Sequence, residues 1–427
     1  MEHLYKYKTD NLMLLMGTNP LPNYVSARML CKPDTRLHLV VTPEIQKTTL
    51  HERLVSLLGK DPKDQSQYLL VESSDPGNIF NGISKRVRTT PGTWGLNYTG
   101  GKKSMATHAY RAMEMTLAKE NREKGLYSYL DADRVELVID PVNGVNSLFF
   151  PIQEQVSLQQ LLSLHGQPDS VVEKVRWTEP DDENIPLRTN KPRRTPYLPE
   201  FCRVWLEASL DSEKSKALNE WRSLQPFYAS GKSKDSIRDE DYQTLLFPEI
   251  IRGHPDVKYQ SIAEMAEKTD QKIKHIVKWL DGMWLEHYVL AQVLVIKDEF
   301  GINDYALGLE SNIFEPVDPR QDTFESDVIA MRGHRLFYLS VTTDRSKSTN
   351  KNKLFEAYHR AQQLGGEHAE AGMVTFFENP DRLVKELRDE RHARVKVFGP
   401  QHLISQEIFQ AELKRWFTAI PAKEKKS

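Results

Sequence analysis

Short apolar runs alternate with amphipathic stretches along residues 11–150. The runs are continuously apolar, which is typical of parallel strands buried on both faces. The stretches between them have helical spacing, so the pattern predicts an α/β domain with a mainly parallel sheet that helices cover on both faces. We predict strands at Leu12–Met16, Leu37–Val41, Tyr68–Val71, Trp94–Tyr98 and Val135–Ile139, and helices at Tyr24–Leu30, Thr49–Leu58, Gly77–Val87 and Ser104–Ala118.

The pattern changes after Pro151. The spacing of apolar residues in Val156–Gly166 predicts a short amphipathic helix that ends at a glycine. Residues 167–200 are polar and contain many prolines, which indicates a linker or an extended arm, and residues 201–250 are mostly helical in pattern. We predict a first domain at residues 1–152, a mostly helical connector at 153–255, a second domain at 256–420 and a disordered tail at 421–427.

The second domain mixes helices with a strand hairpin. A helix begins near Met283, and on this stretch alone Glu286 is expected to face solvent, because burying an unpaired carboxylate is unfavourable. The hairpin turns at Arg332-Gly333-His334. We predict strands at Tyr305–Leu309, Ser326–Met331, Arg335–Thr342, Gly372–Phe376 and Arg394–Phe398, and helices at Leu354–Leu364, Pro380–Arg391 and Leu403–Phe417.

The composition excludes several classes of protein. The chain has 427 residues, 39% hydrophobic and 28% charged, with a net charge of −2, which indicates two or three globular domains and no global polyanion-binding charge. Cys31 and Cys202 are the only cysteines, so a disulfide framework and a cysteine zinc site are excluded. The chain shows neither a signal-peptide core nor an apolar run of about 18 residues. We expect a cytoplasmic protein without membrane contacts.

Two loops carry candidate chemistry in the first domain. Gly17-Thr18-Asn19-Pro20 follows the first predicted strand, and Asn97–Met105 follows the fourth, so both are expected at the same edge of the sheet. The paired Gly100-Gly101 lets backbone N–H groups approach an anion, and the following helix N-terminus and Lys102-Lys103 add positive charge. Neither loop is a dinucleotide fingerprint or a P-loop.

Together the two loops resemble the ligand loops of CRISPR-associated Rossmann-fold (CARF) domains, which bind cyclic oligoadenylates. In the family pattern the second loop reads Thr-Gly-Gly-Thr-Lys, so Lys103 takes the lysine position and Lys102 replaces a threonine. The resemblance implies cyclic tetra-adenylate as activator and a homodimer around a two-fold symmetric ring. It implies ligand contacts from Gly17, Thr18, Asn19, Pro20, Asn97, Thr99, Gly100, Gly101, Lys102, Lys103 and Met105.

The element order of the second domain, and its segments around Glu286 and Asp327, resemble the PD-(D/E)XK nuclease domain of CARF–nuclease effectors. The resemblance implies that Glu286 and Asp327 hold Mg²⁺ or Mn²⁺, which activates water for cleavage of DNA or RNA. The position of the Glu-x-Lys motif reads Ser340-Val341-Thr342, so one carboxylate and one cation are missing.

Three interpretations of this departure stay open. The domain is a degenerate nuclease that binds nucleic acid, or neighbouring groups substitute, or the reaction is a different one. Candidates for substitution are Asp344, which shares a face with Ser340 and Thr342 if the strand continues, together with Glu325, Lys347 and Lys353.

The leading hypothesis is a cyclic-oligoadenylate-activated, metal-dependent nuclease of type III CRISPR antiviral defence. Its main rival is a ligand-responsive DNA-binding regulator, because Ser261–Lys268 and Lys272–Leu280 have the shape of a helix-turn-helix. A third possibility is that the sensor domain itself cuts the cyclic ligand, although the sequence offers no nameable general base for that reaction.

Overall fold

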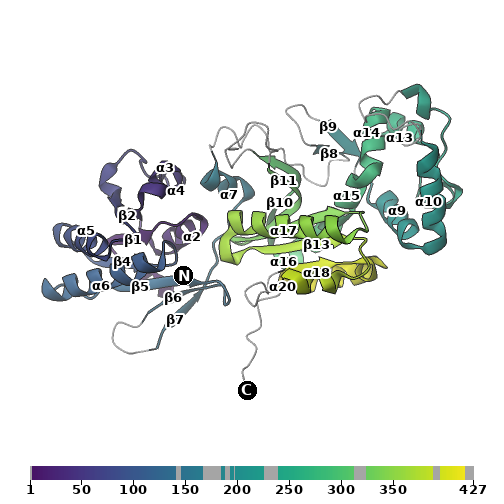
Figure 1. Cartoon of the computed structure of the whole chain (residues 1–427). Coiled ribbons are helices and arrows are strands. Elements are labelled where there is room, and N and C mark those ends of the chain that lie inside the picture. Colours follow the sequence, from purple (N-terminus) through teal and green to yellow (C-terminus); the bar gives the residue numbers. More distant parts are fainter. Residues whose placement is uncertain are drawn as a thin grey trace, which may run out of the picture.

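A seven-stranded sheet organises the N-terminal part of the computed structural model, which describes residues 2–140, 146–166, 184–187, 193–196, 198–225, 239–311, 324–387 and 395–418. We call residues 2–166 the N-terminal unit (Figure 1). The strand order is β3-β2-β1-β4-β5-β6-β7. The first five strands in this order run parallel, and β6 and β7 are antiparallel. The strands are β1 (Asn11–Leu15), β2 (Arg36–Val41), β3 (Tyr68–Leu70), β4 (Trp94–Asn97), β5 (Leu126–Asp131), β6 (Glu136–Ile139) and β7 (Leu148–Pro151).

Helices cover both faces of this sheet, as predicted. On one face α2 packs against Leu14 and Leu39, and on the other α6 packs against Met13 and Val40. The five predicted strands correspond to β1, β2, β3, β4 and β6, whereas β5 and β7 were not predicted. The helices of the unit are α1 (Glu2–Tyr5), α2 (Leu21–Leu30), α3 (Pro43–Lys47), α4 (Leu50–Leu57), α5 (Pro76–Thr89), α6 (Lys103–Lys119) and α7 (Leu158–His165).

A five-stranded sheet with the order β10-β11-β12-β13-β14 forms the core of what we call the C-terminal unit, the described residues of 284–418. The strands are β10 (Ile302–Ser311), β11 (Phe324–Arg332), β12 (Arg335–Thr342), β13 (Glu370–Thr375) and β14 (Val395–Phe398). The predicted hairpin is confirmed, with β11 and β12 antiparallel. The helices are α15 (Trp284–Val295), α16 (Lys297–Phe300), α17 (Lys347–Gly365), α18 (Pro380–Leu387), α19 (Pro400–Leu403) and α20 (Gln406–Thr418).

Side-chain alternation separates the two faces of this second sheet. Val328 and Leu339 lie in one buried cluster with residues of α15 and α20, and Ile329 and Tyr338 lie in another with residues of α17. Helix α17 therefore covers one face and α15 and α20 cover the other.

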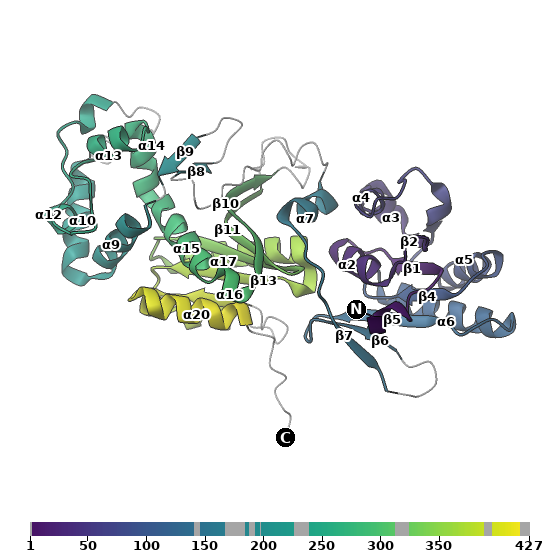
Figure 2. The same ribbon diagram turned by 180° about the vertical axis from the view of Figure 1, so that it is seen from behind.

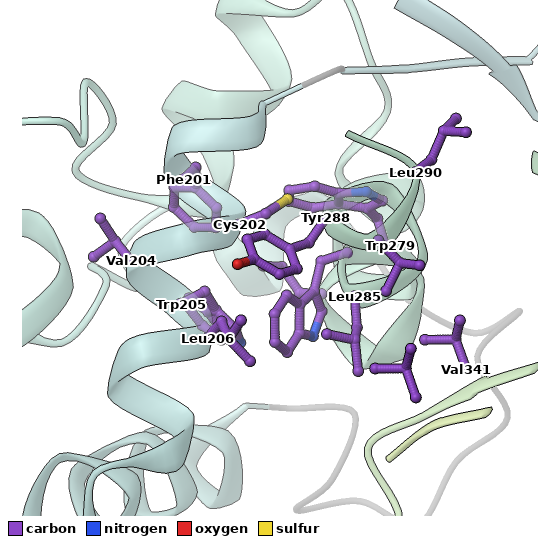
Figure 3. Packing of buried hydrophobic residues seen from close by; sticks show 14 of the residues in the cluster. Phe201, Cys202, Val204, Trp205, Leu206, Trp279, Leu285, Tyr288, Leu290 and Val341 are labelled. Atoms are coloured by element: carbon purple, nitrogen blue, oxygen red, sulfur yellow. The ribbon is translucent and has the colours of Figure 1, made fainter. Parts of the chain in front are cut away.

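A helical connector packs against the α15 side of the C-terminal unit. Its aromatic residues, among them Phe201, Trp205 and Trp279, join Leu285, Tyr288 and Val341 in one buried cluster (Figure 3). A kink at Gly282, within a π-helical turn at Trp279–Met283, separates α14 from α15, between the predicted helix Lys272–Leu280 and the predicted helix that begins near Met283. We use the name connector here for the described residues of 184–283, which extend beyond the predicted bounds of 153–255. It contains α9 (Pro199–Leu210), α10 (Ser212–Leu224), α12 (Glu249–Arg252), α13 (Ile262–Lys268) and α14 (Ile273–Lys278), while β8 (Asn184–Leu187) and β9 (Arg193–Pro196) pair within the predicted linker.

The two units share a hydrophobic core. One buried cluster contains Leu14 and Tyr24 of the N-terminal unit together with Ile329, Tyr338 and Ala361 of the C-terminal unit. Helix α7 lies between the two sheets in both views (Figures 1 and 2) and contributes to the same cluster. The units therefore share one buried cluster, and each also has a buried cluster of its own. Within the described ranges, no helix is both long and apolar enough to cross a bilayer.

The C-terminal end of α17 is capped by side chains of the N-terminal unit. The Asn19 amide Nδ2 donates to the carbonyl oxygens of Gln363 at 3.2 Å and Leu364 at 3.1 Å. The ring Nε2 of His165 also donates to the Leu364 oxygen, at 2.9 Å. The last carbonyls of a helix lack partners within the helix, so these donors supply bonds that α17 cannot make itself.

His165 should make folding sensitive to acid. Burial lowers the pKa of this ring to about 4, whereas in the unfolded chain it is near 6.5. The unfolded state therefore binds the proton first, and stability falls as pH drops from about 6.5 towards 4. His165→Gln keeps an amide donor for Leu364 but does not titrate. Between about pH 7.5 and about pH 5, the free energy of unfolding should decrease by about 2 kcal/mol less in the variant than in the wild type, as measured by thermal unfolding. Equal losses in both proteins would contradict this role.

Candidate ligand cavity and carboxylate site

Two loops at the carboxyl edge of the first sheet lead to opposite faces. The β1–α2 loop, residues 16–20, leads to the face covered by α2, and the β4–α6 loop, residues 98–102, leads to the face covered by α6. Strands β1 and β4 are direct neighbours. Their loops therefore diverge at a topological switch point, where open α/β sheets bind their ligands.

A cavity of about 540 Å³ lies at this switch point. Both loops line it, with further residues from the loop after β2 and the start of α3, and a wall from the C-terminal unit. We call it the switch-point cavity. Its lining residues are Met16, Gly17, Thr18, Asn19, Pro22, Thr42, Glu44, Ile45, Thr99, Gly100, Gly101, Lys102, Met105, Leu130, Gly366, Glu367 and His368.

The paired glycines are required by the close approach of the two loops. A Cβ on Gly100 would lie 2.3 Å from the backbone oxygen of Leu15, a distance that real Cβ atoms do not show. Gly101 has a φ of +78°, in the left-handed region, and a Cβ there would lie 2.9 Å from the Leu15 Cβ. The Gly-Gly pair therefore lets the second loop pass directly over the end of β1.

Asn97 supports the second loop from beneath the cavity. Its buried amide Nδ2 donates to Ser128 Oγ at 3.1 Å, and its Oδ1 accepts from the Thr99 N–H at 3.2 Å and the Thr99 hydroxyl at 2.8 Å. The Thr99 hydroxyl in turn accepts from the Leu130 N–H at 2.8 Å. Of these two predicted ligand residues, Thr99 lines the cavity, and Asn97 holds the loop in place.

Positive charge is concentrated at the start of α6. Lys102 immediately precedes the helix, lines the cavity and donates from Nζ to Ser73 Oγ at 2.9 Å. Lys103 is the first residue of α6; it is exposed and is not among the lining residues. The N-terminus of a helix as long as α6 adds partial positive charge on the same side.

Two carboxylates also line the cavity. Glu44 belongs to α3, and its pKa is lowered by the hydrogen bond from the Thr42 hydroxyl, by its own backbone N–H and by nearby Lys102. Glu367, in the C-terminal unit, is exposed. The cavity thus offers both positive groups and hydrogen-bond acceptors.

Asn19 is placed differently from the prediction of a simple ligand contact. It lines the cavity, but its Nδ2 is bonded to the end of α17, and its Oδ1 accepts from the Leu21 N–H at 2.9 Å. Pro20 is buried at the start of α2 and is not among the lining residues. Gly17, Thr18, Gly100, Gly101, Lys102 and Met105, also predicted to contact ligand, all line the cavity.

The carboxylate site of the C-terminal unit lies where β11 and β12 diverge. The regular ladder ends at the pair Val328 and Leu339. One step further, Asp327 Oδ2 accepts from the Val341 N–H at 2.6 Å and from the Ser340 hydroxyl at 3.2 Å. Asp327 is therefore opposite Ser340, the position that the resemblance assigns to the missing glutamate, and one of its oxygens already bonds to the neighbouring strand.

Glu286 is buried, with 9% exposure, so the expectation from its own stretch that it faces solvent is wrong. It follows Leu285, which packs in the same cluster as Val341 at the end of β12. Helix α15 is apolar around most of its circumference because it fits between the second sheet and the connector. The expectation failed because the helix has no solvent face at this turn.

Asp344 was expected to share the strand face of Ser340 and Thr342 if the strand continued, and this condition is not met, because β12 ends at Thr342. Asp344 is exposed, and its Oδ1 accepts from the Ser346 N–H at 2.5 Å in the turn before α17. This bond and, more weakly, nearby Lys353 lower the pKa of the Asp344 carboxyl. The Thr342 hydroxyl accepts from the Asp344 N–H at 3.2 Å, so both residues shape this turn.

The described residues form no three-ligand metal site around Asp327. In the part of the chain that the structure describes, no three His, Cys, Asp or Glu side chains are grouped to hold a common ion. The Glu325 side chain, a candidate for substitution, lies outside the described part. Lys347 and Lys353 lie in the first two turns of α17.

A larger cavity, of about 680 Å³, lies at the opposite end of β2. Two of its cationic side chains bond to backbone carbonyls: Arg86 donates to the oxygens of Ser66 and Tyr68, and Lys60 donates to the Thr35 oxygen at 3.0 Å. We therefore attribute a structural role to this region.

Two solved structures resemble this fold over nearly its whole length. The crystal structure of protein VC1899 from Vibrio cholerae shares 16% sequence identity, with a TM-score of 0.60, over 96% of this chain and 98% of that chain. The structure of Can2 from Sulfobacillus thermosulfidooxidans in complex with cyclic tetra-adenylate shares 14% identity, with a TM-score of 0.62, over 96% of this chain and 100% of that chain. At these identities the likeness shows the fold and confirms the predicted α/β class. No protein-family model and no curated protein matches the sequence.

Two features of the cavity were not predicted from the sequence: the wall formed by Gly366–His368 and the carboxylate of Glu44. The wall is brought to the cavity only when the two units dock, and nothing in its local sequence indicates a ligand. Glu44 carried a weak signal, because it lies in the first turn of a helix that follows a buried strand, at the edge where ligands are expected.

The close approach of the Gly100-Gly101 loop to the end of β1 predicts that a larger residue at Gly100 lowers the stability of the fold. Gly100→Ala places a methyl group against the Leu15 carbonyl, so the loop must shift, and we expect destabilisation of about 2 kcal/mol or more. Gly82→Ala is the matched control, because its Cβ would meet Leu69 at an ordinary 3.6 Å within helix α5. Thermal unfolding should therefore show a lower midpoint for Gly100→Ala and an unchanged or higher one for Gly82→Ala. Equal midpoints would contradict the described loop contact.

Proposed function

We propose that this chain senses a cyclic oligoadenylate, most simply cyclic tetra-adenylate, as a CARF-type effector of type III CRISPR defence. The observation that carries the proposal is the switch-point cavity, in which the two loops predicted from sequence lie side by side with Lys102 and the start of α6. Phosphodiester groups are anions, and a helix N-terminus with glycine backbones and a lysine suits them.

The likeness to Can2 supports the proposal, because that protein is described in complex with cyclic tetra-adenylate and the similarity extends over both units. A ring with two-fold symmetry matches a pair of cavities related by a two-fold axis, so we propose a homodimer in which each protomer contacts half of the ring.

For the C-terminal unit we propose an action on nucleic acid. Cations follow β12 in the chain: Lys347 and Lys353 belong to the first two turns of α17, and Arg345 precedes them. A second candidate for this unit is metal-dependent cleavage. It is favoured by the position of Asp327 opposite Ser340, and by the packing of Leu285 in α15 in the same buried cluster as Val341. We derive no hydrolytic step.

The helix-turn-helix alternative receives less support. Both helices of the pair exist, α13 and α14, but Ile262, Met265, Ile273 and Ile276 are buried in the core of the connector. Each has only two turns or less, and α14 runs directly into the kinked turn before α15. The pair is therefore accounted for as a packing element.

The charge at the start of α6 should control ligand affinity. Lys102→Ala removes a cation from the cavity, and we expect binding of cyclic tetra-adenylate to weaken by roughly tenfold, with a flatter salt dependence. Lys103→Ala should have a smaller effect, because Lys103 lies outside the lining. Isothermal titration at two salt concentrations measures both, with Lys119→Ala at the other end of α6 as the control. Unchanged affinity in Lys102→Ala would exclude this loop as the phosphate site.

Cleavage and binding by the C-terminal unit are separated by a nuclease assay. Supercoiled plasmid and single-stranded RNA are incubated with Mn²⁺, with and without cyclic tetra-adenylate. Asp327→Asn keeps an acceptor for the Val341 N–H but removes the charge, and Asp344→Asn is the matched control in an exposed turn. If the unit is a nuclease, we expect ligand-dependent cleavage that is lost only in Asp327→Asn. No cleavage together with intact ligand binding would leave nucleic-acid binding as the function.

A further inference from the structure

We propose that the C-terminal unit supplies part of the ligand site, and that Glu367 recognises the adenine amino groups of the ring. This inference rests on the proposed function, because it concerns the same cavity, and it adds the residue that selects the base.

The position of Glu367 is fixed from both sides. Before it, Gly366 lies against Asn19: a Cβ at Gly366 would be 3.2 Å from Asn19 Nδ2, the atom that bonds to the end of α17. After it, the ring of His368 is hydrogen-bonded to the buried His334, with 3.0 Å between Nδ1 and Nε2. The short segment at the mouth of the cavity is thus held at one end by the N-terminal unit and at the other by the second sheet.

The charges of the cavity divide into two kinds. Lys102 and the start of α6 provide positive potential, while Glu44 and Glu367 provide carboxylates. A polyanionic ring is repelled by carboxylates if its phosphates face them. The ring therefore places its phosphates at Lys102 and the start of α6, and its bases towards Glu367 in the wall from the C-terminal unit. Glu44 lies near Lys102, so its carboxylate takes the smaller part in contacting the bases.

Among base edges, a carboxylate suits those that carry an amino group. Adenine presents the N6 amino donor, whereas hypoxanthine and guanine present a carbonyl acceptor at the same position. A carboxylate accepts a hydrogen bond from the adenine amino group and repels the O6 carbonyl. Glu367 is exposed in the cavity wall, and the Glu44 carboxylate already accepts from Thr42, so we assign the larger share of the selection to Glu367.

The experiment compares two rings that differ only in this group: cyclic tetra-adenylate and cyclic tetra-inosinate. Affinities for both are measured by isothermal titration with the full chain, its Glu367→Gln variant and the double variant Glu44→Gln/Glu367→Gln. Glu356→Gln, on the same second unit but outside the cavity lining, is the matched control for the loss of charge. The wild type should prefer the adenylate ring by about tenfold or more.

A glutamine offers both an acceptor and a donor, so it can bond to either base. The ratio of the dissociation constants for the two rings should therefore be several-fold closer to one in Glu367→Gln than in the wild type. The double variant should lose the remaining preference, and Glu356→Gln should keep the wild-type ratio. If Glu367→Gln strengthens binding of both rings equally, the carboxylate acts only through its charge and the inference is overturned. A wild type that binds both rings alike would also overturn it while leaving the sensing function intact. A wild type that binds neither ring would contradict the proposed function itself.

Discussion

The contact between the end of helix α17 and the N-terminal unit is the constraint on which the rest of the structure depends. The carbonyls of Gln363 and Leu364 find their donors on Asn19 and His165, which belong to the other unit. Each such bond contributes about 1 kcal/mol net, and the shared apolar cluster around Tyr24, Tyr338 and Ala361 adds to them. Because this contact is made, the segment after α17 closes one side of the switch-point cavity.

The same contact joins two places that are distant in sequence. Asn19 lies in the cavity, and α17 runs from its cap to the turn that contains Asp344 and Ser346, next to Thr342 and the site around Asp327. A ligand can shift the arrangement of the units only through a difference in affinity between two arrangements. A cavity wall supplied by the C-terminal unit provides such a difference, because the ligand contacts that wall only when the units are docked.

Much of the fold was predictable because local patterns and global structure agree. The continuous apolar strand at Leu12–Met16 is central in the first sheet, and the hairpin before Ser340 has its turn where the sequence places it. Strand β5 was missed because Ser128 interrupts its apolar pattern, and that serine is buried as the partner of Asn97. The edge strand β7 was missed because it is largely exposed, so its sequence lacks the apolar pattern of a buried strand.

The candidate site was predictable only as far as its loops. Gly100, Gly101 and Lys102 could be predicted from the sequence, because a glycine pair indicates a close backbone approach and a lysine indicates positive charge without any knowledge of distant segments. The roles of Asn19 and Glu367 could not, because they depend on tertiary docking of segments more than 300 residues apart in the chain. The burial of Glu286 and the early end of β12 likewise follow from packing against the connector and from the turn before α17.

In the proposed complex, one ligand contacts both units at once. Hydrogen–deuterium exchange of the full chain, with and without cyclic tetra-adenylate, tests it most directly. We expect slower exchange in three places together: residues 17–20, residues 99–105 and the segment Gly366–His368. Protection of the first two loops with unchanged exchange at Gly366–His368 would contradict the shared site.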